Sequence, residues 1–209
     1  MRPHRSILSA GNDWSRVVLL DNEIWPEHSR RDFASIAADR NQEPLDAVYD
    51  LLLGCIDQLH KLMVIIHAYS DDQQRRGVRA HRLCMPGSDA TTLAPNGKLA
   101  ESFFHGAYTW AAWFWRFMVR DERLLSPEDA VFRLTGQAAE RIGLSDRGVL
   151  CEGARADVAV FDSGLFRGRS TVFEPNVLAE GMRHVLVNGV QTLRDGKLTG
   201  DRAGMVLRR

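Results

Sequence analysis

The chain has 209 residues, enough to bury a real hydrophobic core in one large or two small domains. Its 27 Lys and Arg residues balance its 27 Asp and Glu residues, so no overall field attracts nucleic acid or an anionic membrane. Three widely spaced cysteines without a Cys-x-x-Cys pair do not suggest a disulfide framework and predict a reducing cytoplasm.

No targeting or membrane-spanning segment is expected. Residues 1–5 include basic side chains, but no long apolar run follows them as it would in a signal peptide. The most apolar segment, residues 103–117, contains His105 and is too short to cross a bilayer. The sequence therefore predicts a cytoplasmic protein that binds neither membrane nor nucleic acid.

The first third of the chain predicts alternating strands and helices. Residues 14–20 are rich in β-branched and aromatic residues and predict a strand. Residues 31–40 predict a helix that buries Phe33, Ile36 and Ala37. A second helix is expected to begin at Pro44, where a missing N–H costs nothing, and its apolar stripe comprises Leu45, Val48, Tyr49, Leu52 and Ile56.

The next two apolar segments predict further strands. The continuous run at residues 62–66 is typical of a parallel strand buried on both faces. Residues 82–85 predict a short strand that runs through Gly87 and Ser88 into a polar loop carrying Asp89. An acid at the end of a barrel strand often serves in catalysis, although Asp also caps turns. The order of elements predicts a parallel α/β sheet or part of a barrel.

Two helices are expected in the following stretch. Residues 102–117 carry aromatic side chains on nearly every helical face, which predicts a buried core helix. An aromatic substrate wall near His105 is the alternative. A second helix should begin at the Ser126 cap and end at Gly143, and its buried stripe comprises Ala130, Val131, Leu134 and Ala138.

The character of the chain changes near residue 146, where turn residues become frequent. Strands are expected over residues 158–161 and 184–187, and Asn188-Gly189 predicts a hairpin into a strand over residues 190–194. The sequence thus predicts an α/β domain, residues 1–145, followed by a small antiparallel β unit, residues 146–209.

Motifs along most of the chain resemble enzymes of the amidohydrolase superfamily. The generic motifs are Gly87-Ser88-Asp89, His105, Ser126-Pro127-Glu128-Asp129-Ala130, Gly153-Ala154-Arg155-Ala156-Asp157 and Val187-Asn188-Gly189. The more specific ones are Phe173-Glu174-Pro175 and the terminal Gly204-Met205-Val206-Leu207, which resemble N-acyl-D-amino-acid deacylases, or D-aminoacylases. This resemblance is to the C-terminal part of those enzymes. It implies the last strands and helices of a TIM-type (β/α) barrel, followed by part of a composite β-sandwich.

The resemblance also implies a metal-dependent amide hydrolysis. In the family, zinc polarises the scissile carbonyl and activates a water, while a carboxylate carries the proton to the leaving amine. The matching carboxylate is Asp89, which is also a candidate zinc ligand, and the resemblance places Ser88 and His105 beside the substrate. The expected substrate is a small acylated amino acid or a related amide.

The family's metal-binding pattern is missing from this sequence. The seven histidines form no His-x-His pair, and zinc needs at least three protein ligands. A local set comprising His67, Cys84, Asp89 and His105 is the alternative. The chain is therefore expected to be a fragment or to need an N-terminal-half subunit.

The substrate and the activity each have an alternative. Where many deacylases carry His-Pro-Arg, this sequence has His105-Gly106-Ala107, so it lacks the Arg that would clamp a substrate carboxylate. Another small amide or a cyclic ureide would suit the same chemistry. A catalytically inactive remnant or assembly module that forms homo-oligomers through open sheet edges is the non-enzymatic alternative.

Overall fold

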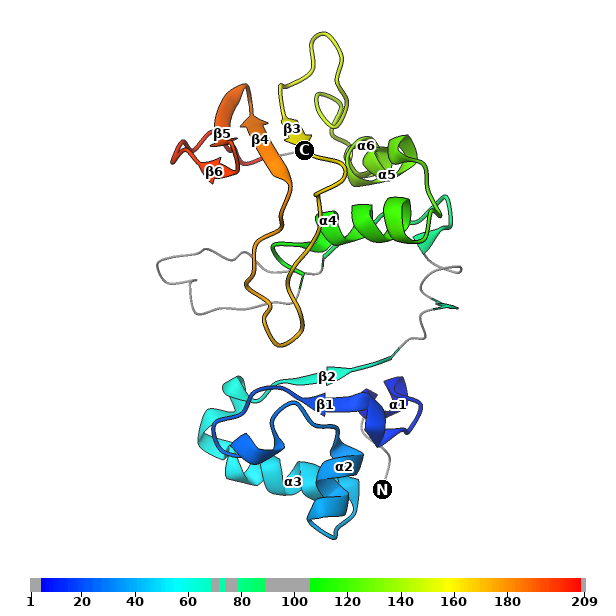
Figure 1. Cartoon of the computed structure of the whole chain (residues 1–209), viewed down its shortest axis with the longest axis vertical. Helices are drawn as coiled ribbons and strands as arrows, with labels where there is room; N and C mark the ends of the chain where they lie inside the picture. Colours follow the sequence, from blue (N-terminus) through cyan, green and yellow to red (C-terminus); the bar gives the residue numbers. More distant parts are fainter. Residues whose placement is uncertain (1–4, 69–71, 74–78, 89–105, 208–209) are drawn as a thin grey trace. The chain divides into compact units, whose positions relative to one another are not determined.

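The structure is a computed structural model that describes residues 5–68, 72–73, 79–88 and 106–207 (Figure 1). Its contacts divide the chain into two compact units, Met1–Arg75 and Arg76–Arg209. The predicted boundary between residues 145 and 146 falls inside the second unit, and the family's division into barrel and sandwich stays a prediction. Every helix in the described part of the chain is too short or too polar to span a bilayer.

The first unit consists of a two-stranded sheet and several short helices (Figure 1). Its elements are α1 (Arg5–Ser9), η1 (Trp14–Arg16), β1 (Val17–Leu19), η2 (Pro26–His28), α2 (Phe33–Asp39), α3 (Pro44–Gly54), η3 (Ile56–Lys61) and β2 (Val64–Ile66). Strand β1 pairs antiparallel with β2, with Val17 opposite Ile66 and Leu19 opposite Val64. The prediction of a parallel strand buried on both faces is therefore wrong, because β2 is partly exposed and pairs antiparallel with β1 in a two-stranded sheet.

The core of the first unit confirms one predicted helix face and corrects another. Phe33, Ile36 and Ala37 are buried, as expected for α2. Pro44 occupies the first turn of α3, also as expected. The buried face of α3 and its C-terminal end, however, consists of Ala47, Leu51 and Cys55, whereas most of the predicted stripe is exposed, namely Tyr49, Leu52 and Ile56. Both stripes have helical spacing, so periodicity alone could not choose between them.

Asp32 caps the N-terminus of α2. Its carboxylate accepts hydrogen bonds from the Ser35 backbone N–H at 2.9 Å and from the Ser35 hydroxyl at 2.7 Å. Burial is the largest single influence and raises the pKa of Asp32, but the hydrogen bonds from Ser35 and from the Asp32 and Ala34 backbone together outweigh it, so the net pKa lies below its usual value. The cap therefore stabilises the fold above the unfolded-state pKa and loses this contribution as the pH falls.

Replacing Asp32 with Ala is expected to lower the free energy of unfolding by about 1 kcal/mol at neutral pH, because an N-cap acceptor is lost. Asp32→Asn should retain most of the stability, since its carbonyl oxygen still accepts. Urea denaturation at pH 7 measures the difference. Equal stability of the Ala variant and the wild type would contradict the capping role.

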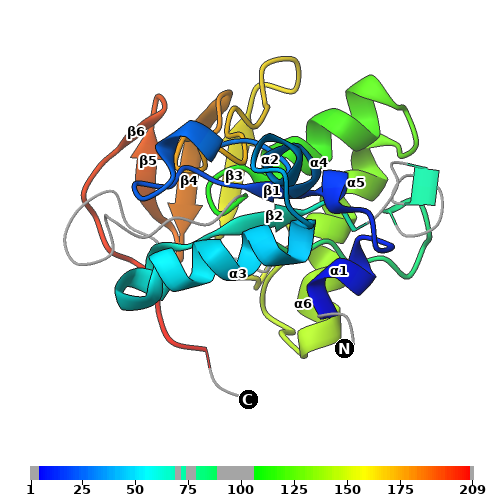
Figure 2. The same cartoon turned by 90° about the horizontal axis from the view of Figure 1, so that it is seen from below.

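The second unit combines helices with a four-stranded sheet. Its elements are α4 (Trp110–Trp115), the π-helix η6 (Arg116–Asp121), α5 (Pro127–Leu134), α6 (Gly136–Ile142), β3 (Val158–Phe161), β4 (Met182–Val187), β5 (Val190–Arg194) and β6 (Lys197–Leu198). The strands lie in the order β3-β4-β5-β6 and every pair is antiparallel (Figure 2). The turn at Asn188 and Gly189 connects β4 to β5, so the antiparallel pairing of the predicted strands and the hairpin are confirmed.

The aromatic helix begins later than the sequence predicts. Residues 106–109 form turns and α4 starts at Trp110, while residues 102–105 lie outside the described residues. Ala112, Phe114 and Trp115 are buried together with Met118, which confirms the described part of the core helix.

The helix predicted from Ser126 to Gly143 is two helices. The Ser126 hydroxyl accepts a hydrogen bond from the Asp129 N–H, and Gly143 ends α6 with a φ of 77°, as expected. Thr135 interrupts the run with φ −132° and ψ −86°. In the predicted stripe Ala130 is buried but Val131 is 39% exposed, whereas the polar side chains of Arg133 and Gln137 are buried. Apolar spacing alone therefore mislocated part of the buried face.

Candidate functional site

The predicted site residues fall at the edge of the described structure. Asp89 and His105 lie outside the described residues, and Ser88, which is partly buried, ends the described segment 79–88. The prediction of a strand over residues 82–85 is wrong. Residues 80–83 form bends and turns, and residues 84–88 have no regular structure. The structure describes the segment that leads to Asp89, residues 79–88.

Two buried polar side chains bind the backbone at the start of this segment. The Arg133 guanidinium donates from Nη1 to the carbonyl oxygens of Arg79 (2.8 Å) and His81 (2.9 Å). Its Nη2 donates to the Ala80 carbonyl at 3.3 Å. A neighbouring bond runs from Gln137 Nε2 to the Arg82 carbonyl at 3.1 Å. Four consecutive carbonyl groups thus accept hydrogen bonds from these two side chains.

The segment is also fixed from within and by the aromatic helix. The Cys84 N–H donates to the His81 carbonyl at 2.9 Å, and the Leu83 N–H donates to His81 Nδ1 at 3.2 Å. The Arg79 guanidinium lies 4.3 Å from the centroid of the Trp113 ring, a cation–π contact. The turn before Ser88 therefore has contacts with α4, α5 and α6.

Sequence reasoning missed Arg133 and Gln137. Both side chains are 7% exposed, and they follow Ala130 at helical spacing. A charged residue in a row of buried positions needs partners for its hydrogen-bond donors. That position was the signal available in the sequence, although the sequence could not identify the carbonyl groups that satisfy it.

The described residues do not fit a zinc site. They contain no cluster of three or more His, Cys, Asp or Glu side chains arranged to hold a metal ion. Of the proposed local set, His67 follows β2 in the first unit and Cys84 belongs to the second unit, while Asp89 and His105 are outside the described residues. A local metal site is therefore not supported by the part of the chain that the structure describes.

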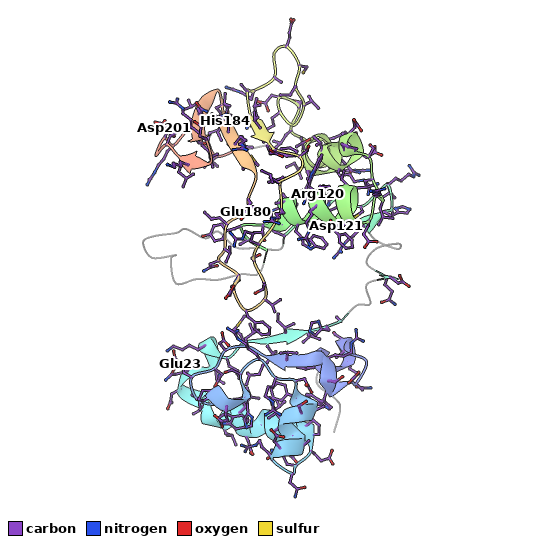
Figure 3. The ribbon with its side chains drawn as sticks, in the orientation of Figure 1. Glu23, Arg120, Asp121, Glu180, His184 and Asp201 are labelled. Carbon is purple, nitrogen blue, oxygen red and sulfur yellow. The ribbon has the colours of Figure 1, made fainter. Side chains whose placement is uncertain are left out.

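The clearest charged cluster lies in the β unit. Glu180, which precedes β4 (Figure 3), accepts from Arg167 Nε at 2.8 Å and from Arg169 Nη1 at 2.7 Å. The hydrogen bond from Arg167 is the main reason that the pKa of Glu180 lies below its usual value. Residues 167 and 180 also form an antiparallel bridge. The cluster therefore joins two backbone segments and has the character of a structural ion pair.

An apolar groove of about 960 Å³ lies on the second unit. Its walls come from α5, α6, residues 148–150 and β3, and most of its lining side chains are apolar. Strand β3 is at the edge of the sheet, and edge strands offer unpaired backbone groups to another segment. Leu150, at 80% exposed, extends this apolar surface.

The first unit has an apolar face of its own. Tyr49, Leu52, Leu53 and Ile56 follow the i, i+3, i+4, i+7 spacing along α3 and its C-terminal end, and all four are exposed. Leu53 is 66% exposed and Ile56 60%. A large exposed apolar stripe of this kind commonly marks a surface that another protein segment covers. We call these four residues the α3 stripe.

Comparison with known proteins gives a consistent family match. A model described as "Amidohydrolase family" matches residues 88–193. The chain is 31% identical over 194 residues to the N-acyl-D-aspartate deacylase of Alcaligenes xylosoxydans xylosoxydans. This match covers 92% of this chain and 36% of that enzyme. It is 36% identical over 144 residues to the N-acyl-D-glutamate deacylase of the same organism, covering 69% of this chain and 28% of that enzyme.

Solved structures agree. The N-acyl-D-glutamate deacylase of Bordetella bronchiseptica, crystallised with zinc and a phosphonate mimic of the tetrahedral intermediate, matches with a TM-score of 0.71 and 30% identity. That match covers 95% of this chain and 38% of the enzyme. A D-aminoacylase described as having a binuclear metal centre also gives a TM-score of 0.71. The chain matches between 28% and 38% of the length of these relatives.

Proposed function

This chain belongs to the amidohydrolase family, and from that premise we propose that it supplies the acid–base carboxylate, Asp89, for hydrolysis of N-acyl-D-amino acids. The observation that carries the proposal is the match of nearly the whole chain to deacylases of this substrate class. The matched family region, residues 88–193, begins one residue before Asp89 and includes His105. Ser88 and His105 are the proposed substrate contacts.

The reaction requires one proton to move twice. In the proposed mechanism the Asp89 carboxylate takes a proton from the attacking water as the water oxygen bonds to the amide carbon. The same carboxyl group then protonates the amine nitrogen as the C–N bond breaks. The products are a carboxylic acid and a free D-amino acid, and Asp89 returns to its ionised state.

The metal ligands are proposed to come from a complementary polypeptide. Zinc supplies Lewis-acid activation of the carbonyl and the water in this class of enzyme. The described residues offer no ligand set, and the sequence has no His-x-His. We therefore assign the metal-binding half of the site to a polypeptide equivalent to the part of the relatives that the match leaves uncovered.

Two apolar surfaces support the need for this complement. The groove beside β3 and the α3 stripe expose side chains that a folded domain normally buries. Three of its four residues, Tyr49, Leu52 and Ile56, belong to the face that the sequence predicted to be buried, which is consistent with a helix that another protein segment covers. An N-terminal-half subunit would cover both surfaces without self-association.

Self-association without catalysis is the second candidate, favoured by the same exposed surfaces. In that case copies of this chain would cover one another's apolar faces and no complement would be needed. Size-exclusion chromatography of the purified chain distinguishes the two proposals. A stable oligomer that neither binds a complement nor acquires activity would favour the assembly module.

The substrate test uses the chain together with its complement. The chain should be co-expressed with the uncovered part of the Bordetella bronchiseptica deacylase, and hydrolysis of N-acetyl-D-glutamate, N-acetyl-D-aspartate and N-acetyl-D-methionine should be compared. We expect hydrolysis by the pair and none by either part. Because Ala107 stands where the resemblance expects an Arg that clamps the substrate carboxylate, weaker binding of all three substrates than in the Bordetella bronchiseptica enzyme is expected. Hydrolysis of a cyclic ureide but of none of these compounds would overturn the proposed substrate class.

A further inference from the structure

The structure points to Arg133 as a positioning residue for the segment that leads to Asp89, with Gln137 as its partner, and we propose this role on the basis of the proposed function. Neither side chain needs to touch the substrate. Each acts on the main chain of residues 79–82, a few residues before Ser88.

The hydrogen bonds converge in an unusual way. Carbonyl groups of four successive residues accept from one guanidinium and one carboxamide, and both side chains are 7% exposed. A backbone carbonyl group that is removed from water needs a hydrogen-bond donor. A guanidinium presents several donors in a rigid planar fork, so it can hold adjacent carbonyl groups in one arrangement.

The clamp extends toward the active-site loop through His81. Its carbonyl oxygen accepts from both Arg133 Nη1 and the Cys84 N–H, and its Nδ1 accepts from the Leu83 N–H. Holding His81 therefore orients the next turn as well. Small displacements of a reacting group lower catalytic rates steeply, so a residue that fixes this turn would influence kcat.

The two helices that carry Arg133 and Gln137 pack closely against the rest of the second unit. Arg133 lies in α5 and Gln137 lies in α6, on the two sides of the break at Thr135. The break brings Gly136 against Gly148, where an added Cβ at Gly148 would lie 2.6 Å from the Ala139 Cβ. The helices that hold the clamp are thus tightly packed against the start of the β unit.

Amide hydrogen exchange tests the clamp on the chain as it exists, without any activity. Arg133→Gln is expected to speed exchange at the Leu83 and Cys84 amides by about tenfold or more, because local opening becomes easier. Exchange in β4 should be unchanged. Arg141→Gln, at an exposed position of α6, is the matched control and should leave both regions unchanged.

A second variant guards against unfolding. If Arg133→Gln also accelerates exchange in β4, that variant has lost stability as a whole. The Gln137→Leu variant then tests the clamp in its place, since it removes only the hydrogen bond to the Arg82 carbonyl. Unchanged exchange at Leu83 and Cys84 in a variant with protected β4 would overturn the clamp. Arg133→Lys should restore part of the protection, because an ammonium reaches fewer of the carbonyl groups.

Kinetics of the chain with its complement test the consequence for catalysis. Arg133→Gln is expected to lower kcat about 100-fold, with KM changed less than about threefold, whereas Arg141→Gln should match the wild type. Faster exchange with an unchanged kcat would overturn the positioning role while leaving the proposed function intact. Full activity of an Asp89→Asn variant would overturn the proposed function, and the exchange result would still decide whether Arg133 holds the turn.

Discussion

Replacing Asp89 with Asn is expected to lower kcat for N-acyl-D-amino-acid hydrolysis by about 10²–10⁴-fold in the chain assembled with its complement. An amide side chain has nearly the same size but cannot take a proton from water at neutral pH. Substrate binding needs no proton transfer, so KM should change little. Steady-state kinetics with N-acetyl-D-glutamate measure both constants.

The control for this substitution is Asp201→Asn, which removes an exposed carboxylate after β6 (Figure 3). It is expected to match the wild type. Metal analysis separates two roles of Asp89: an inactive Asn variant with full zinc content supports proton transfer, whereas loss of zinc together with activity indicates a metal ligand. Undiminished hydrolysis by Asp89→Asn would contradict the assignment.

Replacing Gly181 with Ala is expected to have the largest effect on stability. Gly181 has a φ of 87°, and an added Cβ would lie 2.4 Å from the Phe166 backbone nitrogen and 2.6 Å from the Leu165 carbonyl carbon. Both atoms belong to the main chain, so rotating a side chain cannot relieve the contact. The combined backbone strain and overpacking should lower the free energy of unfolding by roughly 3 kcal/mol.

The matched control is Gly153→Ala. Gly153 also has a positive φ, 85°, but an added Cβ would meet nothing within 4 Å. This variant should lose only about 1 kcal/mol, from backbone strain alone. Thermal unfolding followed by circular dichroism measures both variants, and a Gly181→Ala variant no less stable than Gly153→Ala would contradict the close backbone contact.

The elements that the sequence predicted correctly are those that local chemistry determines. The Ser126 cap, the left-handed Gly143 and the Asn188-Gly189 hairpin depend on neighbouring residues only. The packed face of α2 was also predictable, because its apolar residues occupy a single stripe. Such signals operate within a few residues and do not depend on the rest of the fold.

The incorrect predictions concern partners that are distant in sequence. Apolar runs do not specify strand direction, so the antiparallel pairing of β1 and β2 was missed. Helix α3 carries two apolar stripes, and only packing shows that Ala47 and Leu51 face the core. The turn at residues 80–83 replaces a predicted strand because its carbonyl groups bind Arg133 and Gln137, more than 50 residues away.

The family was predictable from motifs, whereas the three-dimensional arrangement of the candidate site residues stays a prediction. Gly87-Ser88-Asp89 and the motifs of the β unit led to the amidohydrolase family, which the comparisons confirm. Arg133 escaped notice because its neighbours in the helix resemble an ordinary amphipathic surface. Its proposed role depends on its hydrogen bonds to the backbone of residues 79–81. The apolar spacing of a helix gives no information about such distant partners.

Zinc analysis of the purified chain, alone and assembled with its complement, tests the central claim most directly. We expect the chain alone to retain far less than one equivalent of zinc after dialysis and to hydrolyse no N-acyl-D-amino acid. The assembled pair should retain about one equivalent or more and hydrolyse the substrate. About one tightly bound zinc and hydrolysis by this chain alone would contradict the account.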